Sequence, residues 1–550
     1  MSKSTEVATT AVAPTSSRRS FLKGIGCAAA SLGSLPLLAG ALNKVQAADF
    51  FYGSTPSPNI FTRRSKSLSV RQFAAMIQYG LSIPTQTPNQ DERLYQGKIA
   101  NFSKGLPHNN LGEVDKVAYD RLLAAISSGR HSDYEAIPMG GSVKLANPQG
   151  ALAYQFEGGD SHSYACPAFF PLASEQLAGE MVEMYWHALA LDVPFSQYGQ
   201  ESQTTAAIND LKRFKNYSNL NAGNLFRVGL PGDATGPLIS QFLWRDVPCG
   251  PFTLQQRYKF PSAGNLHMTN YDQWLAIQRG APAFTSGSFD TTPRYIRNAH
   301  DMAEWVHKDF TFQSFQNAAL ILMGINAQRD ANPYSNSTSQ SGFITFGGPH
   351  ILDLIARAAY AALKASWHQK WQVHRSLRPE VLAGRVHNHI RGAASYPLHS
   401  LLLNSAGVQQ TFSRYGTYLL PQVYPEGSPT HPSYPSGHAT IAGACATVLK
   451  AFFNESFVLT NSLMASDDGL SLLPYSGENL TVGGEINKLA GNIAIGRDYA
   501  GVHYRQDATQ GLLLGEKLAL NLLSESKLLL NEGTLTTFTL TKFDGQTVSF

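Results

Sequence analysis

Three cations and two histidines in the C-terminal half of the chain could together bind an anion and act on it. The cations are Lys370, Arg378 and Arg497, and the histidines are His438 and His503. Cations neutralise the oxygens of a tetrahedral oxyanion, one imidazole can attack or ligate its central atom, and the other can move protons at the opposite apex. These residue types therefore predict a site for an oxyanion of the phosphate type, provided that three distant segments meet.

The first segment carries two of the cations. Lys370 lies near the end of a long amphipathic helix predicted over residues 350–374, and Arg378 directly precedes Pro379. Because a residue before proline favours an extended backbone, a helix end followed by such a turn can bring both cations to one spot. A solvated basic face is the other interpretation of this segment.

The second segment begins a helix. Ser436 and Gly437 open an apolar helical run, and the free N–H groups and positive dipole end of such a start suit an anion. His438, in the first turn, would then face the bound anion and could transfer protons. The alternatives are a plain N-cap at Ser436 and a structural histidine at position 438.

The third segment pairs a histidine with an acid. His503 and Asp507 are four residues apart, which places them on one face of the next helix. Asp507 could accept a hydrogen bond from one imidazole nitrogen and leave the other free to bind an electrophile. An ordinary helical His–Asp pair would have the same spacing.

Helices must position these segments, and helical periodicity recurs along the chain. It predicts helices over residues 69–79, 176–192, 301–323, 350–374, 438–453, 483–496 and 502–524. The stretches 48–175 and 205–300 are rich in turn-forming residues, so we expect mainly surface loops there, with a few short helices within 48–175.

The sequence of the C-terminal tail predicts a β-hairpin, the single hairpin that we expect. Apolar and β-branched residues over 535–541 meet an Asp-Gly pair at 544–545, which is typical of a tight turn. The expected fold is mainly α: a single helical-bundle domain over 48–550 with long loops. Its active-site bundle spans about 340–525, and the small hairpin about 533–550.

Composition excludes two classes of protein. With 43% hydrophobic and 15% charged residues in 550, the chain is too apolar to be disordered. The formal charge of +4 is local, because residues 1–47 hold five basic residues and one acid and leave 38 of each sign in the rest. A nucleic-acid-binding protein needs surplus cations to displace counterions, so none is expected as a partner.

The first 47 residues are typical of an export signal. The pair Arg18-Arg19 precedes a weakly apolar run over 24–42, and small residues end at Ala47, where we place the cleavage. Paired arginines in this position resemble a twin-arginine signal, which predicts a periplasmic or extracellular protein without stable membrane insertion after cleavage. A membrane anchor is the alternative.

The three segments together resemble the signature of the superfamily that joins phosphatidic-acid-phosphatase-type acid phosphatases and vanadium-dependent haloperoxidases. Its pattern is Lys…Arg-Pro, then Pro-Ser-Gly-His, then Arg-x5-His-x3-Asp. Residues 435–438 match the second part, and Arg497, His503 and Asp507 match the third. The motifs span about 340–525, and the length of the chain suits a haloperoxidase better than a compact phosphatase.

This chain differs from the phosphatase pattern in two ways that favour the haloperoxidase branch of the superfamily. Seven residues separate Lys370 from Arg378, where the phosphatase pattern has six, and Gly496 stands where phosphatases usually have Ser. The longer spacing is similar to algal and cyanobacterial bromoperoxidases. So is His431, seven residues before His438.

The resemblance implies a haloperoxidase-like fold with vanadate as cofactor. His503 would be the axial vanadium ligand, His438 the acid–base group, and Lys370 would also polarise the peroxide. The oxygens of vanadate would be held by Lys370, Arg378, Ser436, Gly437 and Arg497. Asp507 would orient His503, while His431 and Trp367 would shape the halide side.

The resemblance also implies partners. Hydrogen peroxide, a halide (bromide above all) and a small organic molecule would be the substrates, and relatives commonly form homo-oligomers. Some algal relatives bind calcium in a region comparable to the polar loop with Asp330 and Asn332, but the sequence assigns no ligands, and a solvated turn is the other interpretation.

Two other functions use the same pocket. A secreted acid phosphatase would use His503 as nucleophile and pass through a phosphohistidine. A non-catalytic exported protein would capture phosphate or vanadate without turnover. Activity with and without added vanadate separates these alternatives from a haloperoxidase.

Overall fold

The structure is a computed structural model that describes residues 59–284 and 287–550. All of them belong to one compact unit, Ser57–Phe550. The predicted export signal and the cleavage after Ala47 lie outside the described residues and stay predictions.

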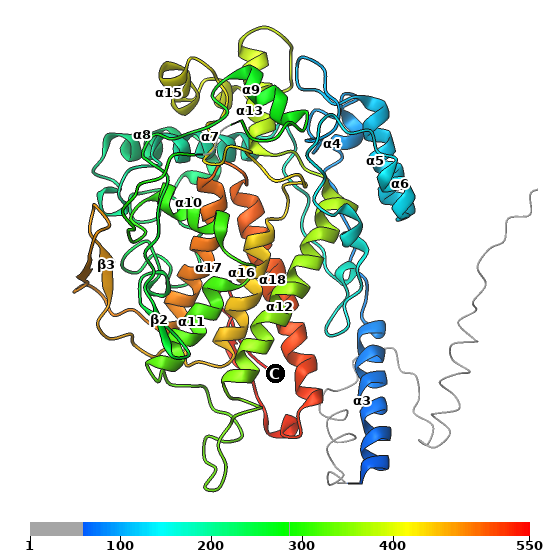
Figure 1. The fold of residues 1–550 in the computed structure, drawn as a ribbon, viewed down its shortest axis with the longest axis vertical. Helices are drawn as coiled ribbons and strands as arrows, with labels where there is room; N and C mark the ends of the chain where they lie inside the picture. Colours follow the sequence, from blue (N-terminus) through cyan, green and yellow to red (C-terminus); the bar gives the residue numbers. More distant parts are fainter. Residues whose placement is uncertain (1–58, 285–286) are drawn as a thin grey trace, which may run out of the picture. The chain divides into compact units, whose positions relative to one another are not determined.

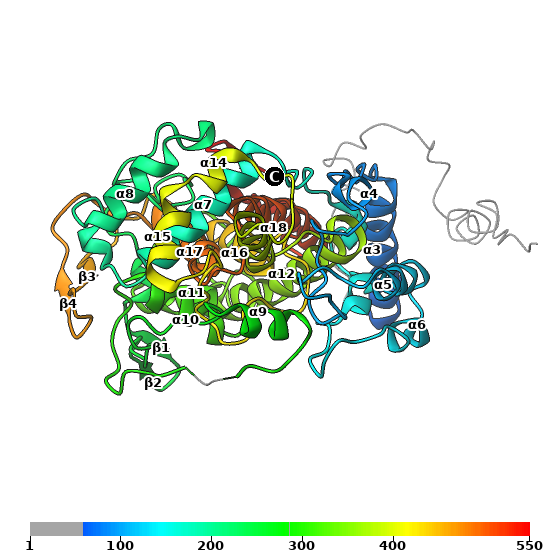
Figure 2. The same cartoon turned by 90° about the horizontal axis from the view of Figure 1, so that it is seen from above.

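Four long helices form a bundle in which α16 is central (Figure 1). They are α12 (Gly348–His368), α16 (Gly437–Lys450), α17 (Val482–Tyr499) and α18 (Arg505–Ser526). Viewed end-on in Figure 2, α16 lies among the other three. Thirteen of its fourteen residues are buried, which explains its almost unbroken apolar sequence.

Glycines allow α16 and α18 to approach closely. A Cβ atom on Gly515 would lie 2.0 Å from the carbonyl oxygen of Thr440, and one on Gly443 would lie 2.1 Å from that of Leu512. Any side chain at either position would push the two helices apart. The close contact fixes the N-terminus of α18 beside the N-terminus of α16.

The prediction of one helix over 301–323 is wrong. The structure has two helices, α10 (Ala299–Lys308) and α11 (Gln313–Gly324). The chain leaves the helix at Asp309, whose φ and ψ of −63° and 147° are extended. The apolar periodicity continues across the break because both helices pack on the same core.

The other predicted helices are present, with bounds that differ at the ends. Residues 69–79 belong to the longer α3 (Ile60–Gly80), 176–192 correspond to α7 (Glu175–Leu189), and 350–374 divide into α12 and a π-helical turn, η6 (Gln369–His374). The few short helices expected without bounds within 48–175 include α4 (Asp91–Leu94), α5 (Lys116–Ser128) and α6 (His131–Glu135). Helices that the sequence did not predict are α8 (Ser202–Leu211), α9 (Tyr271–Gln278), α13 (Pro379–Ile390), α14 (Ser400–Leu403) and α15 (Ala406–Tyr415).

The described strands form three short antiparallel hairpins. Their bounds are β1 (Val247–Cys249) with β2 (Phe252–Leu254), β3 (Leu463–Ala465) with β4 (Leu472–Pro474), and β5 (Thr539–Thr541) with β6 (Thr547–Ser549). The third is the predicted C-terminal hairpin, with Leu540 opposite Val548. Gly545 turns it at a φ of 83°, which glycine adopts without strain. The mainly α fold is therefore confirmed.

Within the described part of the chain, no helix has both the length and the apolar character needed to cross a bilayer.

Candidate functional site

The three predicted segments meet at one end of the bundle, where α12 ends, α16 begins and α17 turns into α18 (Figure 1). The backbone N–H of Ser436 donates to the carbonyl of Asp507 at 3.0 Å, which joins the second segment to the third. The backbone N–H of Ser433 donates to the carbonyl of Ser376 at 3.1 Å, which joins the second to the first.

Lys370 lies in the π-helical turn η6, and its side chain is fully buried. Its Nζ donates to the carbonyl oxygens of Pro432 and Ser433 at 2.8 and 2.6 Å. Burial, and next the nearby charge of Arg378, hold the pKa of Lys370 well below 10.5. A buried ammonium that carbonyl dipoles alone satisfy is suited to an additional anionic partner.

Arg378 adopts the extended backbone predicted before Pro379, with φ −87° and ψ 155°. Its Nε donates to the carbonyl of His431 at 3.0 Å, and its Nη1 donates to that of Val502 at 2.7 Å. The same Nη1 lies 3.0 Å from Nε2 of His503. Burial lowers the pKa of Arg378 from 12.5 to about 9, although the charges of Asp507 and Glu380 act in the opposite direction.

His503 is held in one orientation by Asp507, but it lies just before α18, whose N-cap is Tyr504, and not on the helix as predicted. The Nδ1 of His503 lies 2.7 Å from Oδ2 of Asp507, so Nδ1 carries the proton and the lone pair of Nε2 points toward Arg378. The hydroxyl of Ser433 donates to the same Oδ2, and the backbone N–H of Tyr504 donates to it at 3.2 Å. Nε2 is thus the nitrogen that is prepared to ligate an electrophilic atom.

The ionisation of this pair follows its burial. Burial, and next the positive charge of Arg378 and Lys370, hold the pKa of His503 well below 6.5, so the imidazole is neutral. Burial raises the pKa of Asp507 from 3.8 to about 6, against the hydrogen bond from Ser433 that lowers it. Its Oδ1 has no hydrogen-bond partner among the described residues.

Arg497 occupies the last turn of α17. Its Nη1 donates to the carbonyl of Val306 at 2.9 Å and lies 3.1 Å from the hydroxyl of Tyr424, whose ring centre is 5.2 Å from the guanidinium. Arg497 is close enough to lower the pKa of Lys370, Arg378 and His503 through its charge. Its Nε is buried and has no partner within the described ranges.

The N-terminus of α16 has the cap that the sequence predicts. The side chain of Ser436 accepts from the N–H of Ala439 at 3.4 Å, so the N-cap interpretation is confirmed. A Cβ atom at Gly437 would lie 3.5 Å from the ring of Trp367, which places that ring beside the start of the helix.

His438 lies nearer to solvent than the rest of the site. Its side chain is 33% exposed, and its Nε2 is 3.2 Å from Oδ1 of Asp309. Asp309 was not among the predicted site residues, because the periodicity predicted one continuous helix through it. The break after α10 is what turns the carboxylate toward the histidine.

His431 and Trp367 form a small aromatic wall. Their ring centres are 4.6 Å apart, and Nδ1 of His431 is 3.0 Å from Nη2 of Arg378. Burial, and next the charges of Lys370 and Arg378, hold the pKa of His431 well below 6.5. The neutral ring of His431 therefore gives this side of the site an apolar surface. Because it carries no positive charge, it does not compete with the buried cations for a bound anion.

The arrangement fits a buried oxyanion. The charges of Lys370, Arg378 and Arg497 all act on the neutral His503, and Asp507 binds the far side of that ring. Burying this much positive charge without a counterion is unfavourable, as the lowered pKa values of Lys370 and Arg378 report. The Nε of Arg497, which has no hydrogen-bond partner among the described residues, and the Nε2 of His503, whose lone pair faces Nη1 of Arg378, are suitable contacts for vanadate.

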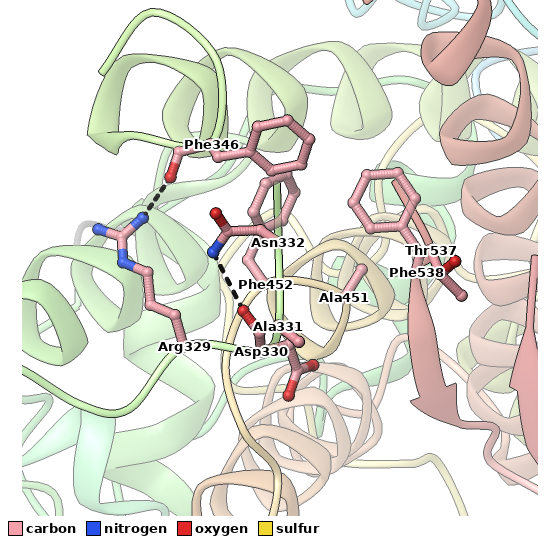
Figure 3. A pocket seen from close by; sticks show the side chains of 9 residues that line it. All are labelled: Arg329, Asp330, Ala331, Asn332, Phe346, Ala451, Phe452, Thr537 and Phe538. Carbon is pink, nitrogen blue, oxygen red and sulfur yellow. Dashed lines mark hydrogen bonds between the residues drawn. The ribbon is translucent and has the colours of Figure 1, made fainter. Parts of the chain in front are cut away.

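The polar loop considered for calcium lines a separate, narrow pocket (Figure 3). The amide of Asn332 donates to the carbonyl of Asp330 at 3.1 Å, and its Oδ1 caps the turn by accepting from Tyr334. Burial and the charge of Glu455 raise the pKa of Asp330 to about 6. No cluster of three or more His, Cys, Asp or Glu side chains in the described residues could hold a metal ion, so calcium stays a prediction without ligands.

Comparisons with known proteins agree with this geometry. A family model described as the VCPO second helical-bundle domain matches residues 350–532. A vanadium-dependent bromoperoxidase from Ascophyllum nodosum is 38% identical over 82% of this chain and 86% of the relative. One from Corallina officinalis is 31% identical over 90% and 99%, respectively.

A solved structure is similar over almost the full length. The homohexameric second vanadate-dependent bromoperoxidase of Ascophyllum nodosum superposes with a TM-score of 0.85 at 29% identity, covering 95% of both chains. The fold and the sequence together place this chain in one family. It belongs to the vanadium-dependent bromoperoxidases, and the resemblance to the haloperoxidase branch is confirmed.

Proposed function

We propose that this protein oxidises bromide with hydrogen peroxide in a vanadate-dependent reaction. The product would be hypobromous acid or an equivalent species that halogenates small organic molecules. The observation that carries the proposal is the concentration of buried positive charge around the neutral His503. Membership of the bromoperoxidase family supports the choice of halide. No observation favours the phosphatase or the binding-protein alternative.

Each residue of the site has a defined part in this proposal. Nε2 of His503 would ligate vanadium, because Nδ1 is already engaged with Asp507. The oxygens of vanadate would be held by Lys370, Arg378, Arg497, Ser436 and the N–H of Gly437. Vanadate, when bound, supplies a Lewis acid that activates peroxide without changing oxidation state.

His438 is the proposed acid–base group. Its partial exposure lets it exchange protons with water, and Asp309 holds its ring. Lys370 would hold positive charge beside the reacting oxygens. His431 and Trp367 would form the halide side, where the halide approaches over neutral rings.

A vanadate titration tests the proposal. Purified protein stripped of metal should oxidise bromide only after vanadate is added, as measured by bromination of a phenol dye in the presence of peroxide. Phosphate should compete with vanadate, because both occupy the same cluster of cations. Equal bromide oxidation by stripped and reconstituted protein would refute vanadate dependence, and efficient phosphate-ester hydrolysis without bromination would favour the phosphatase.

We also propose that the chain is exported and assembles with copies of itself. The sequence of residues 1–47 supports export by the twin-arginine route to the periplasm or the extracellular space. The homohexameric relative supports a homo-oligomer. Replacing Arg18 and Arg19 with Lys should retain the protein in the cytoplasm, as fractionation would detect.

A further inference from the structure

The loop that carries His431 contains neither helix nor strand. It runs over residues 423–435, just before the N-terminus of α16. Its far end is fixed beside the site, because the N–H of Ser433 donates to the carbonyl of Ser376 at 3.1 Å and the hydroxyl of Ser433 donates to Asp507. The contacts of its near end, before His431, therefore decide where that ring lies.

A buried ion pair between Lys104 and Glu380 holds the near end. The Nζ of Lys104 lies 2.9 Å from Oε1 of Glu380, and the two side chains are 4% and 0% exposed. The same Nζ donates to the carbonyl oxygens of Glu426 and Ser428 at 2.7 and 2.6 Å. All the protons of the ammonium are therefore engaged, and the loop accepts two of them.

Glu380 contacts the loop with its other oxygen. Its Oε2 accepts from the backbone N–H of Ser428 at 2.9 Å, while its Oε1 also accepts from the side-chain amide of Gln278 at 3.1 Å. Gly427 makes this approach possible, because its φ is 65° and a Cβ atom there would lie 2.2 Å from Oε2 of Glu380. Both carboxylate oxygens accept from donors, so a side chain with one acceptor oxygen cannot replace Glu380.

Stability alone does not explain this ion pair. Burying two charges is unfavourable, and an apolar pair of similar volume is often as stable. Burial lowers the pKa of Lys104 from 10.5, while the charge of Glu380 acts in the opposite direction. The charges give directed contacts instead: three hydrogen bonds of the pair end on the backbone of residues 426–428.

The pair also joins the loop to the segment that carries an anion-binding cation. Glu380 lies in the first turn of α13, two residues after Arg378. The Nε of Arg378 donates to the carbonyl of His431 at 3.0 Å. The start of α13 thus contacts the loop both before His431 and at it. These contacts place the ring of His431 where its centre is 4.6 Å from that of Trp367.

We propose that Lys104 and Glu380 form a positioning pair that sets where His431 stands on the halide side of the site. Both residues act through the loop and not on the reacting atoms. The role of the halide side rests on the proposed function, whereas the placement of the loop does not. The pair extends the site into the N-terminal half of the chain, because Lys104 lies 276 positions before Glu380.

Hydrogen–deuterium exchange of the metal-free protein tests the placement of the loop without the reaction. Lys104→Met removes the ammonium and keeps an unbranched side chain. It should raise the exchange rate of the amides of residues 426–431 by about tenfold or more and leave α16 unchanged. Glu380→Gln should have the same effect, because its amide nitrogen cannot accept from Lys104 or Ser428.

Lys488→Met is the matched control. Lys488 is also a buried lysine, with a side chain 1% exposed, and it pairs with Glu485 and donates to the carbonyl of Thr235 at 2.7 Å. It lies in the first half of α17, whereas Arg497 lies in the last turn. This variant should lower the stability of the fold to a similar extent, but it should leave the exchange of residues 426–431 and the KM for bromide unchanged.

The kinetic consequence is a higher KM for bromide. In the vanadate-loaded enzyme, Lys104→Met and Glu380→Gln should each raise this KM about 5- to 20-fold, with kcat changed less than about threefold, because the halide side is no longer fixed. Vanadate affinity, measured by equilibrium dialysis, should change less than about threefold, because the far end of the loop, which holds Lys370, keeps its own contacts.

Three results would overturn the inference. The first is wild-type exchange of residues 426–431 in both variants. The second is faster exchange throughout the protein, which would show that the pair stabilises the whole fold. The third is a released loop without any change in the KM for bromide. A wild type that does not brominate, but whose loop is released in both variants, would support the placement of the loop by the pair and refute the proposed function alone.

Discussion

The two histidines of the site differ in how the fold surrounds them. His503 is 2% exposed, and its ring is fixed by Asp507 on one side and Arg378 on the other. The side chain of His438 is 33% exposed and contacts Asp309 at 3.2 Å. The first environment suits a neutral ligand, and the second suits a group that gains and loses protons. The position of each histidine in the fold, and not its residue type, therefore distinguishes the proposed vanadium ligand from the proposed acid–base group.

The largest effect should come from removing the buried histidine. His503→Ala removes the nitrogen proposed to ligate vanadium, so we expect no detectable vanadate binding at concentrations that saturate the wild type. Equilibrium dialysis of metal-free protein measures this directly. Circular dichroism should show an intact fold. Unchanged vanadate affinity would mean that the ligand is another residue.

Removing the exposed histidine should separate binding from turnover. His438→Ala should lower kcat about 10²- to 10⁴-fold, the usual contribution of a general acid–base group. Vanadate affinity should change less than about tenfold, because the cations and His503 remain. Steady-state bromination and dialysis test the two parts. A variant that loses vanadate but turns over normally when saturated would reverse the proposed division.

Asp507→Asn should have an intermediate effect. The amide can donate to Nδ1 of His503, which would shift the imidazole proton to Nε2 and remove the lone pair needed for ligation. We expect vanadate affinity to fall about 10- to 100-fold, as for other groups that orient a metal ligand.

Ser433→Ala is the matched control for Asp507→Asn. It removes one donor to the Asp507 carboxylate and keeps the tautomer of His503, so its loss of affinity should be smaller. If both variants bind vanadate like the wild type, Asp507 does not orient the ligand.

The smallest effect that we expect is a change in stability with pH. Burial keeps the pKa of His503 well below 6.5, so its ring should stay neutral in the folded protein at pH 6. The folded state then binds fewer protons than the unfolded state at acidic pH, and His503 reduces stability as the pH falls below about 6.5. Nitrogen-15 NMR of labelled metal-free protein should show the Nδ1-protonated tautomer at pH 6. A protonated ring there would contradict the assignment.

The sequence was sufficient where function depends on local pattern. Ser436 at the start of α16 and the extended backbone of Arg378 before Pro379 follow from short-range rules of capping and proline sterics. The predicted contact between His503 and Asp507 forms, but His503 precedes the N-cap Tyr504 of α18, so the two residues do not share a helix face as predicted. The predicted residues of the three segments come together because glycines in α16 and α18 bring those helix ends close. No prediction of helix crossing was possible from periodicity alone.

The residues that were missed act over long sequence distances. Asp309 reaches His438 across 129 positions, and Tyr424 reaches Arg497 across 73. No motif in the sequence around Asp309 or Tyr424 identifies it as a site residue, because its contact with the site forms only when the helices have packed. Ser433 lies two residues before the Pro-Ser-Gly-His motif, and this proximity was the available signal.

The π-helical turn at Gln369–His374 explains how the longer Lys370–Arg378 spacing is accommodated. A π-helical turn holds one more residue than an α-helical turn, so an insertion can widen the helix locally without displacing the chain on either side. The widened turn also ends at Arg375, which has a left-handed backbone and begins the path to Arg378. One additional residue thus changes the distance in sequence between two anion-binding cations while both still reach the same site.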